Sequence, residues 1–488
     1  MHLIDFIIFI VFTLGVVALG CSFFRKGSTA EEFTAAGHAL PGWVVGMSIF
    51  ATYVSSISYI GYPGKAFASN WNAFVFSLSI PIASYVAARW FVPFYRRVGS
   101  VSAYTFLEER FGRWARLYAS ACYLLTQVAR MGSILYLLAV PMYILMGWNL
   151  YAVIILTSVA IIAYSMLGGL RAVIWADAIQ GLILIGGALV TLAILLFSMP
   201  EGPLQAFDLA MNAPTGNKLS LGALSADLTT STFWVCLIYG IFINLQNYGI
   251  DQNYVQRYHA ARTDRDARFS ALFGGWLFIP VSALFFLIGT ALYGYYTVNP
   301  ELLPTEIIAK PDYVFPYFIV NGLPVGLRGL LIASIFAAGM STVSTSVTSA
   351  ATVILKDYYQ PFVKTSEGSD RRHVTVLRVS SAVVGALGVV VALAMLRVES
   401  IIDAWWTLSS IFSGGMLGLF LLGILPRRIP RVAAIIGCVC GVLVIGWISL
   451  AGLWHLPGIH LHEYLAIVLG TTTIFLVGFL LALLLKRK

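Results

Sequence analysis

An apolar segment near the start of the chain is interrupted by the stretch Phe50-Ala-Thr-Tyr-Val-Ser-Ser-Ile-Ser-Tyr-Ile-Gly-Tyr-Pro-Gly64. A second apolar segment carries a comparable stretch, Gly240-Ile-Phe-Ile-Asn-Leu-Gln-Asn-Tyr-Gly-Ile-Asp-Gln252. Small and polar residues inside a membrane helix can break it, and a broken helix frees backbone groups to bind solutes and ions. Glycine and serine could instead serve only close helix packing. Because the two stretches begin matching groups of helices, we favour a binding site near the middle of a membrane.

The composition is that of an integral membrane protein. Of 488 residues, 59% are hydrophobic and 10% are charged, whereas soluble domains carry about 25% charged residues. Apolar stretches of roughly 20 residues suit spanning helices, and the alternation typical of a membrane β-barrel is missing. We therefore predict an all-α membrane fold with thirteen helices, at 2–23, 40–63, 71–95, 114–147, 149–167, 173–198, 231–250, 268–296, 313–355, 373–396, 401–425, 430–453 and 463–485. The segment 313–355 is too long for one span and is expected to include a short helix outside the membrane.

The basic residues predict the orientation of these helices. Alternate loops and the C-terminus hold 23 Lys and Arg residues, and the opposite side holds only five, namely Lys65, Lys218, Lys310, Arg328 and Arg397. Cytoplasmic loops carry the excess of such residues, so the N-terminus is expected outside and the C-terminus in the cytoplasm. Because these basic residues orient the helices, the formal charge of +9 does not indicate nucleic acid as a partner. The expected partners are the lipid bilayer and a small molecule, and no obligate protein partner is evident.

The number of spans divides the chain into two repeats. Five helices within 40–198 start from the inside, and because five is odd, the next five within 231–425 start from the outside. The two groups therefore have opposite topology, as in transporters built from inverted repeats. An extra helix at 2–23 precedes them, and two more at 430–486 follow.

Two ionisable residues within the predicted spans stand out as candidates for function. Asp177 lies a few residues into helix 173–198, and Arg130 lies in the middle of helix 114–147. A charge at this depth costs at least about 2.5–3.5 kcal/mol and is by default a sign of function. Asp177 could instead cap a helix start, and Arg130 could reach toward a headgroup.

Hydroxyl side chains form a third polar feature. The run Ser341-Thr-Val-Ser-Thr-Ser-Val-Thr-Ser349 places Ser341, Ser344, Thr345 and Thr348 on one helix face. Such hydroxyls could bind Na⁺, or could simply bond to carbonyls of their own helix. In the first interrupted stretch, Tyr53, Ser55, Ser56 and Ser58 offer a hydroxyl and aromatic surface for a solute.

Four motifs together resemble the sodium/solute symporter family over nearly the whole chain. They are Phe50-Ala-Thr-Tyr-Val-Ser-Ser-Ile-Ser58, Tyr164-Ser-Met-Leu-Gly-Gly-Leu170 with Ile174-Trp-Ala-Asp-Ala-Ile-Gln-Gly181, Asp251-Gln-Asn-Tyr-Val-Gln-Arg-Tyr258, and Ala337-Ala-Gly-Met-Ser-Thr-Val-Ser-Thr-Ser346. The resemblance implies a LeuT-like five-plus-five inverted repeat and alternating access driven by Na⁺, with one or two coupling ions.

The resemblance also implies site residues. The family's main sodium site corresponds here to Ala51, Val54, Ala338, Ser341 and Thr342. A second sodium site, found in bacterial sialic acid symporters among others, corresponds to Asp177, Ser341, Ser344 and Thr345. Those symporters pair an Arg with the substrate carboxylate, and Arg130 resembles that residue. The other expected substrate contacts are Tyr53, Ser55, Ser58, Ser77, Asn244 and Gln246, with Asn247 as a further candidate. Tyr53 stands where those proteins have Thr, and Ser77 where they have Gln, so the pocket is expected to differ.

Other functions stay open at this point. The solute could be a neutral sugar or a small monocarboxylate instead of a carboxylate-bearing sugar. A transporter-like sensor is disfavoured because no signalling domain is expected, and no catalytic constellation suggests an enzyme. His455, His460, His462 and Glu463 could bind a metal in an outside loop or simply be solvated. The short loops favour a bacterial inner membrane.

Overall fold

The computed structural model describes residues 2–22, 30–55, 57–363, 369–398, 400–451 and 461–485. Ser56, His455 and His460 lie outside these ranges. So do six of the 23 cations of the alternate loops and the C-terminus, namely Arg25, Lys26, Lys364, Lys486, Arg487 and Lys488. The described chain is helical and contains no strand, only an isolated bridge between Leu40 and Ala261. The predicted all-α fold is therefore confirmed.

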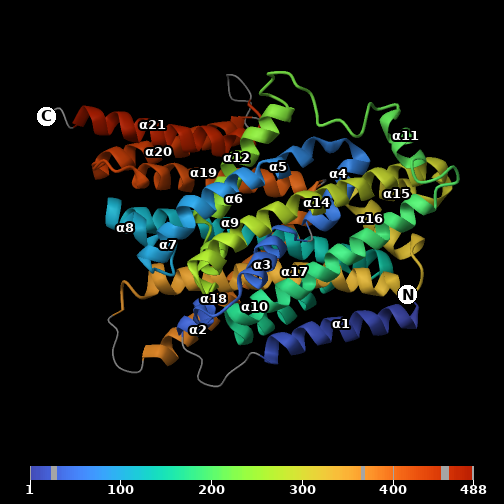
Figure 1. The fold of residues 1–488 in the computed structure, drawn as a ribbon, viewed down its shortest axis with the longest axis horizontal. Coiled ribbons are helices and arrows are strands. Elements are labelled where there is room, and N and C mark those ends of the chain that lie inside the picture. Colours follow the sequence, from blue (N-terminus) through green and yellow to red (C-terminus); the bar gives the residue numbers. More distant parts are fainter. Residues whose placement is uncertain are drawn as a thin grey trace.

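Ten long helices form an elongated bundle (Figure 1). They are α1 (Leu3–Ser22), α9 (Arg113–Met146), α10 (Leu150–Phe197), α12 (Phe233–Ile250), α14 (Asp264–Val298), α17 (Leu327–Val353), α18 (Ser369–Ala394), α19 (Ile401–Ile424), α20 (Arg431–Ala451) and α21 (Leu465–Leu485). Shorter helices connect them: α2 (Ala30–Ala35), α3 (Gly42–Tyr53), α4 (Tyr62–Ala68), α5 (Phe74–Leu78), α6 (Ile80–Val86), α7 (Val92–Val98), α8 (Thr105–Phe111), α11 (Gln205–Met211), α13 (Gln252–Ala260), α15 (Thr305–Ile308) and α16 (Pro311–Gly322). The two chain ends lie at opposite ends of the bundle.

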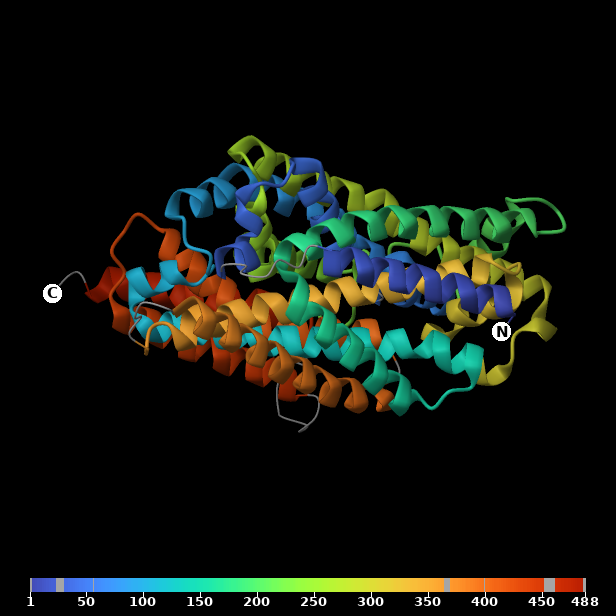
Figure 2. The ribbon, with the colours of Figure 1, turned by 90° about the horizontal axis from the view of Figure 1, so that it is seen from below.

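The number of spans agrees only in part with the prediction. Ten helices of the described chain are long and apolar enough to cross a membrane, or eleven if the bent pair of α3 with Ile57–Ala68 counts as one span. They are the long helices named above without α1, together with the span Trp71–Val98, which contains α5, α6 and α7. The predicted helices 149–167 and 173–198 form one element, α10, and Figure 2 shows its two arms running in different directions. The predicted segment 313–355 divides into α16 and α17, as expected from its length.

The first predicted break is present. Helix α3 ends at Tyr53, and the chain bends by 55° before the segment Ile57–Ala68, which comprises one π-helical turn and α4. At the bend, the backbone N–H of Ser55 donates to the carbonyl of Tyr53 at 3.0 Å, instead of the carbonyl of Ala51 that a continuous helix would use. The bend therefore frees a carbonyl at buried depth.

The second break is narrower than predicted. Helix α12 continues through Gly240 and Gly249 to Ile250, and only Asp251 leaves helical geometry, with φ −75° and ψ 125°. A glycine weakens a helix by about 1 kcal/mol, which tight packing offsets: a Cβ at Gly249 would lie 2.8 Å from the ring of Phe91. Asp251 then starts α13, because its carboxylate accepts from the backbone N–H of Asn253 at 2.8 Å.

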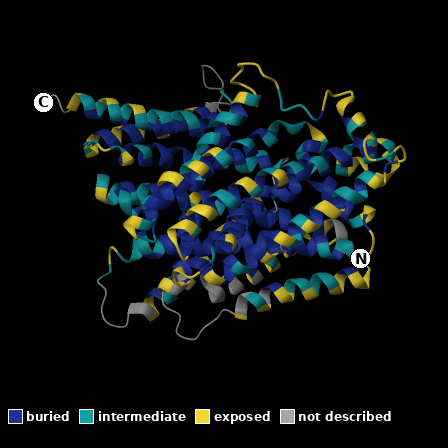
Figure 3. Cartoon of the chain, viewed as in Figure 1, coloured by how far each residue is buried: buried dark blue, intermediate teal, exposed yellow. Residues whose placement is uncertain are grey.

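Helix α14 holds both halves of the first broken helix in place. A Cβ at Gly274 would lie 2.9 Å from the carbonyl of Gly46 in α3, and one at Gly289 would lie 2.3 Å from the carbonyl of Pro63 in α4. Small residues allow such close backbone approach in membrane bundles. Figure 3 shows the buried residues concentrated along the middle of the bundle, where these helices meet.

Candidate functional site

A cavity lies beside the two helix breaks. Both broken helices contribute to its wall, together with α5, α9 and α19. The lining residues are Tyr53, Ser55, Ile57, Ser58, Tyr62, Phe76, Thr126, Gln127, Arg130, Tyr239, Ile243, Asn247, Asp251, Tyr254, Ile402, Trp405, Trp406 and Ser409. Four of the seven residues predicted to contact a solute are among them, namely Tyr53, Ser55, Ser58 and Arg130.

Arg130 is the cation of this cavity. It projects from the middle of α9, is 8% exposed, and donates a hydrogen bond from Nη2 to the carbonyl of Thr52 at the end of α3. Asp251 at the second break lines the same cavity and accepts from the side-chain amide of Gln127 at 3.4 Å. The cavity therefore contains a guanidinium with further donor groups available, close to both helix breaks.

Tyr53 shapes the cavity wall next to this cation. Its hydroxyl donates to Oδ1 of Asn244 at 2.5 Å and accepts from Nδ2 of Asn247 at 3.2 Å. Its ring stacks on Tyr248, with centroids 5.5 Å apart. Both hydrogen bonds reach from the first broken helix to α12, so Tyr53 connects the two segments that the sequence pairs.

Three predicted solute contacts do not line the cavity. Ser77 faces α14, where its hydroxyl lies 2.7 Å from that of Ser282. Asn244 lies behind Tyr53 and donates to the hydroxyl of Ser79 at 2.9 Å. Gln246 is 1% exposed, and neither end of its amide has a partner within the described chain. Sequence position on the right helix did not reveal which face each residue occupies.

The residues predicted for the main sodium site are all buried. Ala51 and Val54 are on α3 and its end, and α3 contacts α17, which carries the other three. On α17, the hydroxyl of Thr342 donates to the carbonyl of Ala338 at 3.0 Å. Carbonyl and hydroxyl oxygens are the hard donors that a cation such as Na⁺ binds, so the residues fit the ion that the sequence predicts.

The residues predicted for the second sodium site gather around Asp177. The hydroxyl of Ser341 donates to Oδ1 of the Asp177 carboxylate, and Ser344 donates to the carbonyl of Ser341 at 2.9 Å. Ser48 of α3, which the sequence did not single out, donates to Oδ2 at 2.5 Å. The set therefore spans α3, α10 and α17.

A buried arginine also reaches this carboxylate. Arg257 of α13 donates from Nη2 to Oδ2 of Asp177 at 2.9 Å and to the hydroxyl of Thr345 at 3.1 Å. Its Nε donates to the hydroxyl of Ser48 at 2.8 Å. Arg257 is one of the 23 basic residues that the sequence assigns to loops and the C-terminus, and this assignment was wrong, because its side chain is 0% exposed. The only signal was its place at the end of the motif Asp251–Tyr258.

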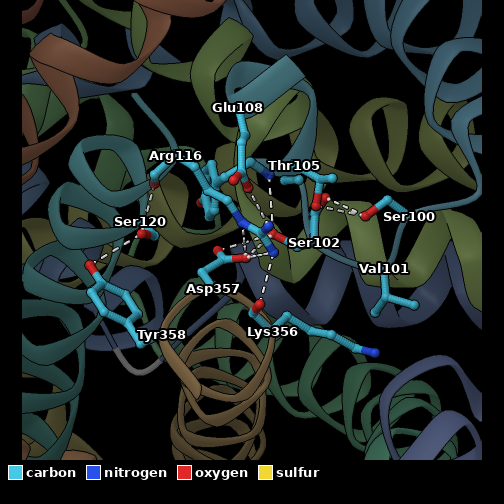
Figure 4. Close-up of polar contacts among 12 residues, drawn as sticks. Ser100, Val101, Ser102, Thr105, Glu108, Arg116, Ser120, Lys356, Asp357 and Tyr358 are labelled. Atoms are coloured by element: carbon cyan, nitrogen blue, oxygen red, sulfur yellow. Dashed lines mark hydrogen bonds and ion pairs between the residues drawn. The ribbon is translucent and has the colours of Figure 1, made fainter. Parts of the chain in front are cut away.

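A second buried polar cluster lies where α9 begins (Figure 4). Arg116 bonds to the carboxylate of Asp357 at 2.6 Å and to that of Glu108 at 2.6 Å. Asp357 is fully buried and also accepts from the hydroxyl of Ser102 at 2.8 Å. The cluster joins α8, α9 and the turn that follows α17 (Ile354–Tyr359) at the end of the bundle away from the N-terminus.

Comparison with known proteins now decides the family. A model of the sodium:solute symporter family matches residues 33–441, which include both helix breaks and the Asp177 cluster. The chain belongs to this family. It is therefore a multi-pass membrane transporter and not an enzyme, as the sequence predicted.

Individual proteins are similar to this chain over most of its length. The sodium/sialic acid symporter NanT of Aliivibrio fischeri is 32% identical over 488 residues, covering 99% of this chain and 94% of that protein. A solved Na⁺-coupled sialic acid symporter, in a substrate-bound outward-open state, superposes with a TM-score of 0.89 at 29% identity, covering 99% of this chain and 98% of the other. Mhp1, a nucleobase-cation-symport-1 family transporter, shares the fold with a TM-score of 0.57 at 14% identity, over 91% and 92% of the two chains.

Proposed function

We propose that this chain is a Na⁺-coupled symporter of a carboxylate-bearing sugar of the sialic acid type, working by alternating access. The proposal rests mainly on Arg130. This residue is 8% exposed, and it lines the cavity beside the two helix breaks. A carboxylate matches a guanidinium in bidentate geometry. The similarity to symporters named for sialic acid supports this class of solute.

The remaining cavity wall suits a sugar. Besides Tyr53, six aromatic residues of the lining offer flat surfaces for the C–H face of a sugar ring: Tyr62, Phe76, Tyr239, Tyr254, Trp405 and Trp406. Ser55 and Ser58 add hydroxyls that can bond to those of the sugar.

The proposed coupling ions bind on two sets of oxygen donors. The main ion binds carbonyls and hydroxyls of Ala51, Val54, Ala338, Ser341 and Thr342. A second ion binds the carboxylate of Asp177 with Ser341, Ser344 and Thr345. Because Ser341 belongs to both sets, both ions would bind to α17. A displacement of α17 would therefore affect both ion sites.

We propose the predicted topology for this bundle. The N-terminus is outside and the C-terminus in the cytoplasm of a bacterial cell, in the inner membrane, with no obligate protein partner. Repeats at 40–198 and 231–425 have opposite orientation, with the extra helices at 2–23 and 430–486. Support comes from the chain ends at opposite ends of the bundle (Figure 1) and from the division of the other cations in the sequence, 22 to five once the buried Arg257 is left out.

Thermal stabilisation of the purified protein tests the function. Sialic acid, neutral sugars and monocarboxylates are each added in NaCl or in KCl, because a ligand that binds the folded state raises its stability by mass action. We expect a rise in unfolding temperature with sialic acid in Na⁺ only. A rise with a neutral sugar or a monocarboxylate alone would replace the proposed solute with that one.

A further inference from the structure

The loop between α10 and α12 contains one lysine, Lys218, and its side chain is buried. It is 3% exposed, and within the described chain no carboxylate forms an ion pair with it. Instead, Nζ donates to the carbonyl of Phe67 at 2.8 Å and to those of Ala68 and Ser69 at 3.4 Å each. The ring of Tyr293 in α14 lies 4.4 Å from Nζ.

These three carbonyls form the C-terminal end of α4, the second half of the first broken helix. A helix leaves its last four carbonyls without partners inside the helix, and this end carries partial negative charge. A lysine ammonium has three N–H donors and so satisfies the three carbonyls together. Burial of the cation is compensated here by the helix end and by the aromatic face of Tyr293.

The backbone of the same loop is also attached to this corner of the bundle. The carbonyl of Ser220 accepts from the backbone N–H of Trp71 at 3.0 Å. The carbonyl of Leu221 accepts from the side-chain amide of Asn72 at 3.1 Å. The loop therefore runs across the end of α4 and fixes it at several points, with Lys218 as the only charged contact among them.

The opposite end of α4 belongs to the cavity. Tyr62, the first residue of α4, lines the cavity, and so does Ser58 in the turn before it. Together with the π-helical turn Ile57–Gly61, α4 forms one short helical segment, Ile57–Ala68. Helices α14 and α16 pack along this segment, and the loop with Lys218 holds its far end, so the position of Tyr62 and Ser58 depends on that end as well as on the packing.

We infer that Lys218 is a positioning residue for solute binding, which sets the cavity wall by capping the outer half of the first broken helix from the loop above it. The inference rests on the proposed function for its solute, but the cap itself can be tested without transport. Because no residue of this loop lines the cavity, the effect reaches the solute only through α4.

The test compares Lys218→Met, which removes the charge and keeps the stem, with Lys218→Arg. Lys310→Met is the matched control, because Lys310 is exposed on the same predicted side and only faces the ring of Tyr313, at 5.2 Å. In proteoliposomes at saturating Na⁺, we expect Lys218→Met to raise the KM for sialic acid about fivefold, the size of a lost charge–helix-end contact, with Vmax nearly unchanged. Lys218→Arg and the control should keep KM close to wild type. A lower Vmax at unchanged KM would show a merely structural role and overturn the inference.

Two further readouts separate this inference from the proposed function. Hydrogen exchange over residues 62–72 should accelerate in Lys218→Met, and unchanged exchange would contradict the cap even if no solute were transported. Burial lowers the pKa of Lys218. As pH rises, its ammonium should therefore lose the proton, and with it the cap on α4, at a lower pH than an exposed lysine would. We expect KM to rise at alkaline pH in wild type but not in Lys218→Arg, whose guanidinium stays protonated, and a rise shared by both would contradict the role of Lys218.

Discussion

Arg257 and Asp177 form an ion pair inside the helix bundle, with Nη2 of the arginine 2.9 Å from Oδ2 of the aspartate and both side chains fully buried. The pair connects α13, which follows the second helix break, to α10, and Ser48 and Thr345 extend it to α3 and α17. Two opposite charges at this depth are tolerated only together. A sodium ion at Asp177 would therefore join a pair that is already neutral, and would have to share the carboxylate with Arg257.

Removing one partner of the Arg257–Asp177 pair should lower the free energy of unfolding far more than removing both. We expect Arg257→Met to destabilise the protein by roughly 3–5 kcal/mol, because it leaves a buried carboxylate unpaired. The double variant Asp177→Asn/Arg257→Met should recover most of this loss. Thermal unfolding in KCl measures both, and equal instability of the single and double variants would contradict the pairing. In NaCl, the single variant should gain more stability than wild type, since Na⁺ can replace the missing cation.

Asp177 should also govern how many sodium ions act together. The Hill coefficient is limited by the number of interacting sites, so we expect it to fall to about one in Asp177→Asn, with part of the solute binding retained. Asp312→Asn is a suitable control, because Asp312 is buried elsewhere and accepts from the backbone of Ile401 at 3.1 Å. Sodium titration of uptake gives the coefficient. An unchanged value in Asp177→Asn would remove the second sodium site.

The hydroxyls of α17 should differ sharply in how much Na⁺-dependent uptake is lost when each is removed. Ser341→Ala and Thr342→Ala should abolish Na⁺-dependent uptake, because each removes an oxygen of the proposed main site. Ser346→Ala is the matched control: Ser346 lies on the same helix, is fully buried, and its hydroxyl has no partner within the described chain. Equal loss in all three variants would indicate a packing effect, and full activity of Ser341→Ala and Thr342→Ala would refute the main site.

Removing one charge of the Arg116 cluster should destabilise the protein far more than removing one charge of an exposed ion pair (Figure 4). Arg116→Met leaves Asp357, whose side chain is 0% exposed, without its cation, and we expect a loss of about 3–5 kcal/mol. Arg262→Met breaks an ion pair whose arginine is 61% exposed, and should cost less than about 1 kcal/mol. The unfolding temperatures of the two variants in detergent check this order, which similar values would contradict.

The fold was predictable where helices are long and apolar, and the first break was predictable from its run of polar residues. The second break was placed too widely, because a sequence does not show that packing against Phe91 keeps Gly249 helical. The short helices α8, α11 and α13 were missed, since their formation depends on caps and contacts more than on hydrophobicity. The two helices predicted at 149–167 and 173–198 correspond to the two arms of α10 (Figure 2).

The candidate site was predictable by helix but not by helix face. Tyr53 and Arg130 line the cavity, whereas Ser77 and Asn244 bond to neighbouring helices. Which side of a buried helix meets a cavity depends on crossing angles that a single sequence does not contain. Arg257 was missed because a cation near a loop is usually solvated, and only the tertiary structure reveals the carboxylate opposite it.

Uptake of sialic acid into proteoliposomes by Arg130→Gln tests the central claim most directly. Wild type should accumulate the sugar acid when an inward Na⁺ gradient is imposed, and not with K⁺. Arg130→Gln should lose at least about tenfold in affinity, since a charged hydrogen bond contributes roughly 1.5–3 kcal/mol. Arg89→Gln, at an exposed arginine away from the cavity, should behave as wild type. Uptake by Arg130→Gln with wild-type affinity, or uptake by wild type that does not need Na⁺, would contradict the account.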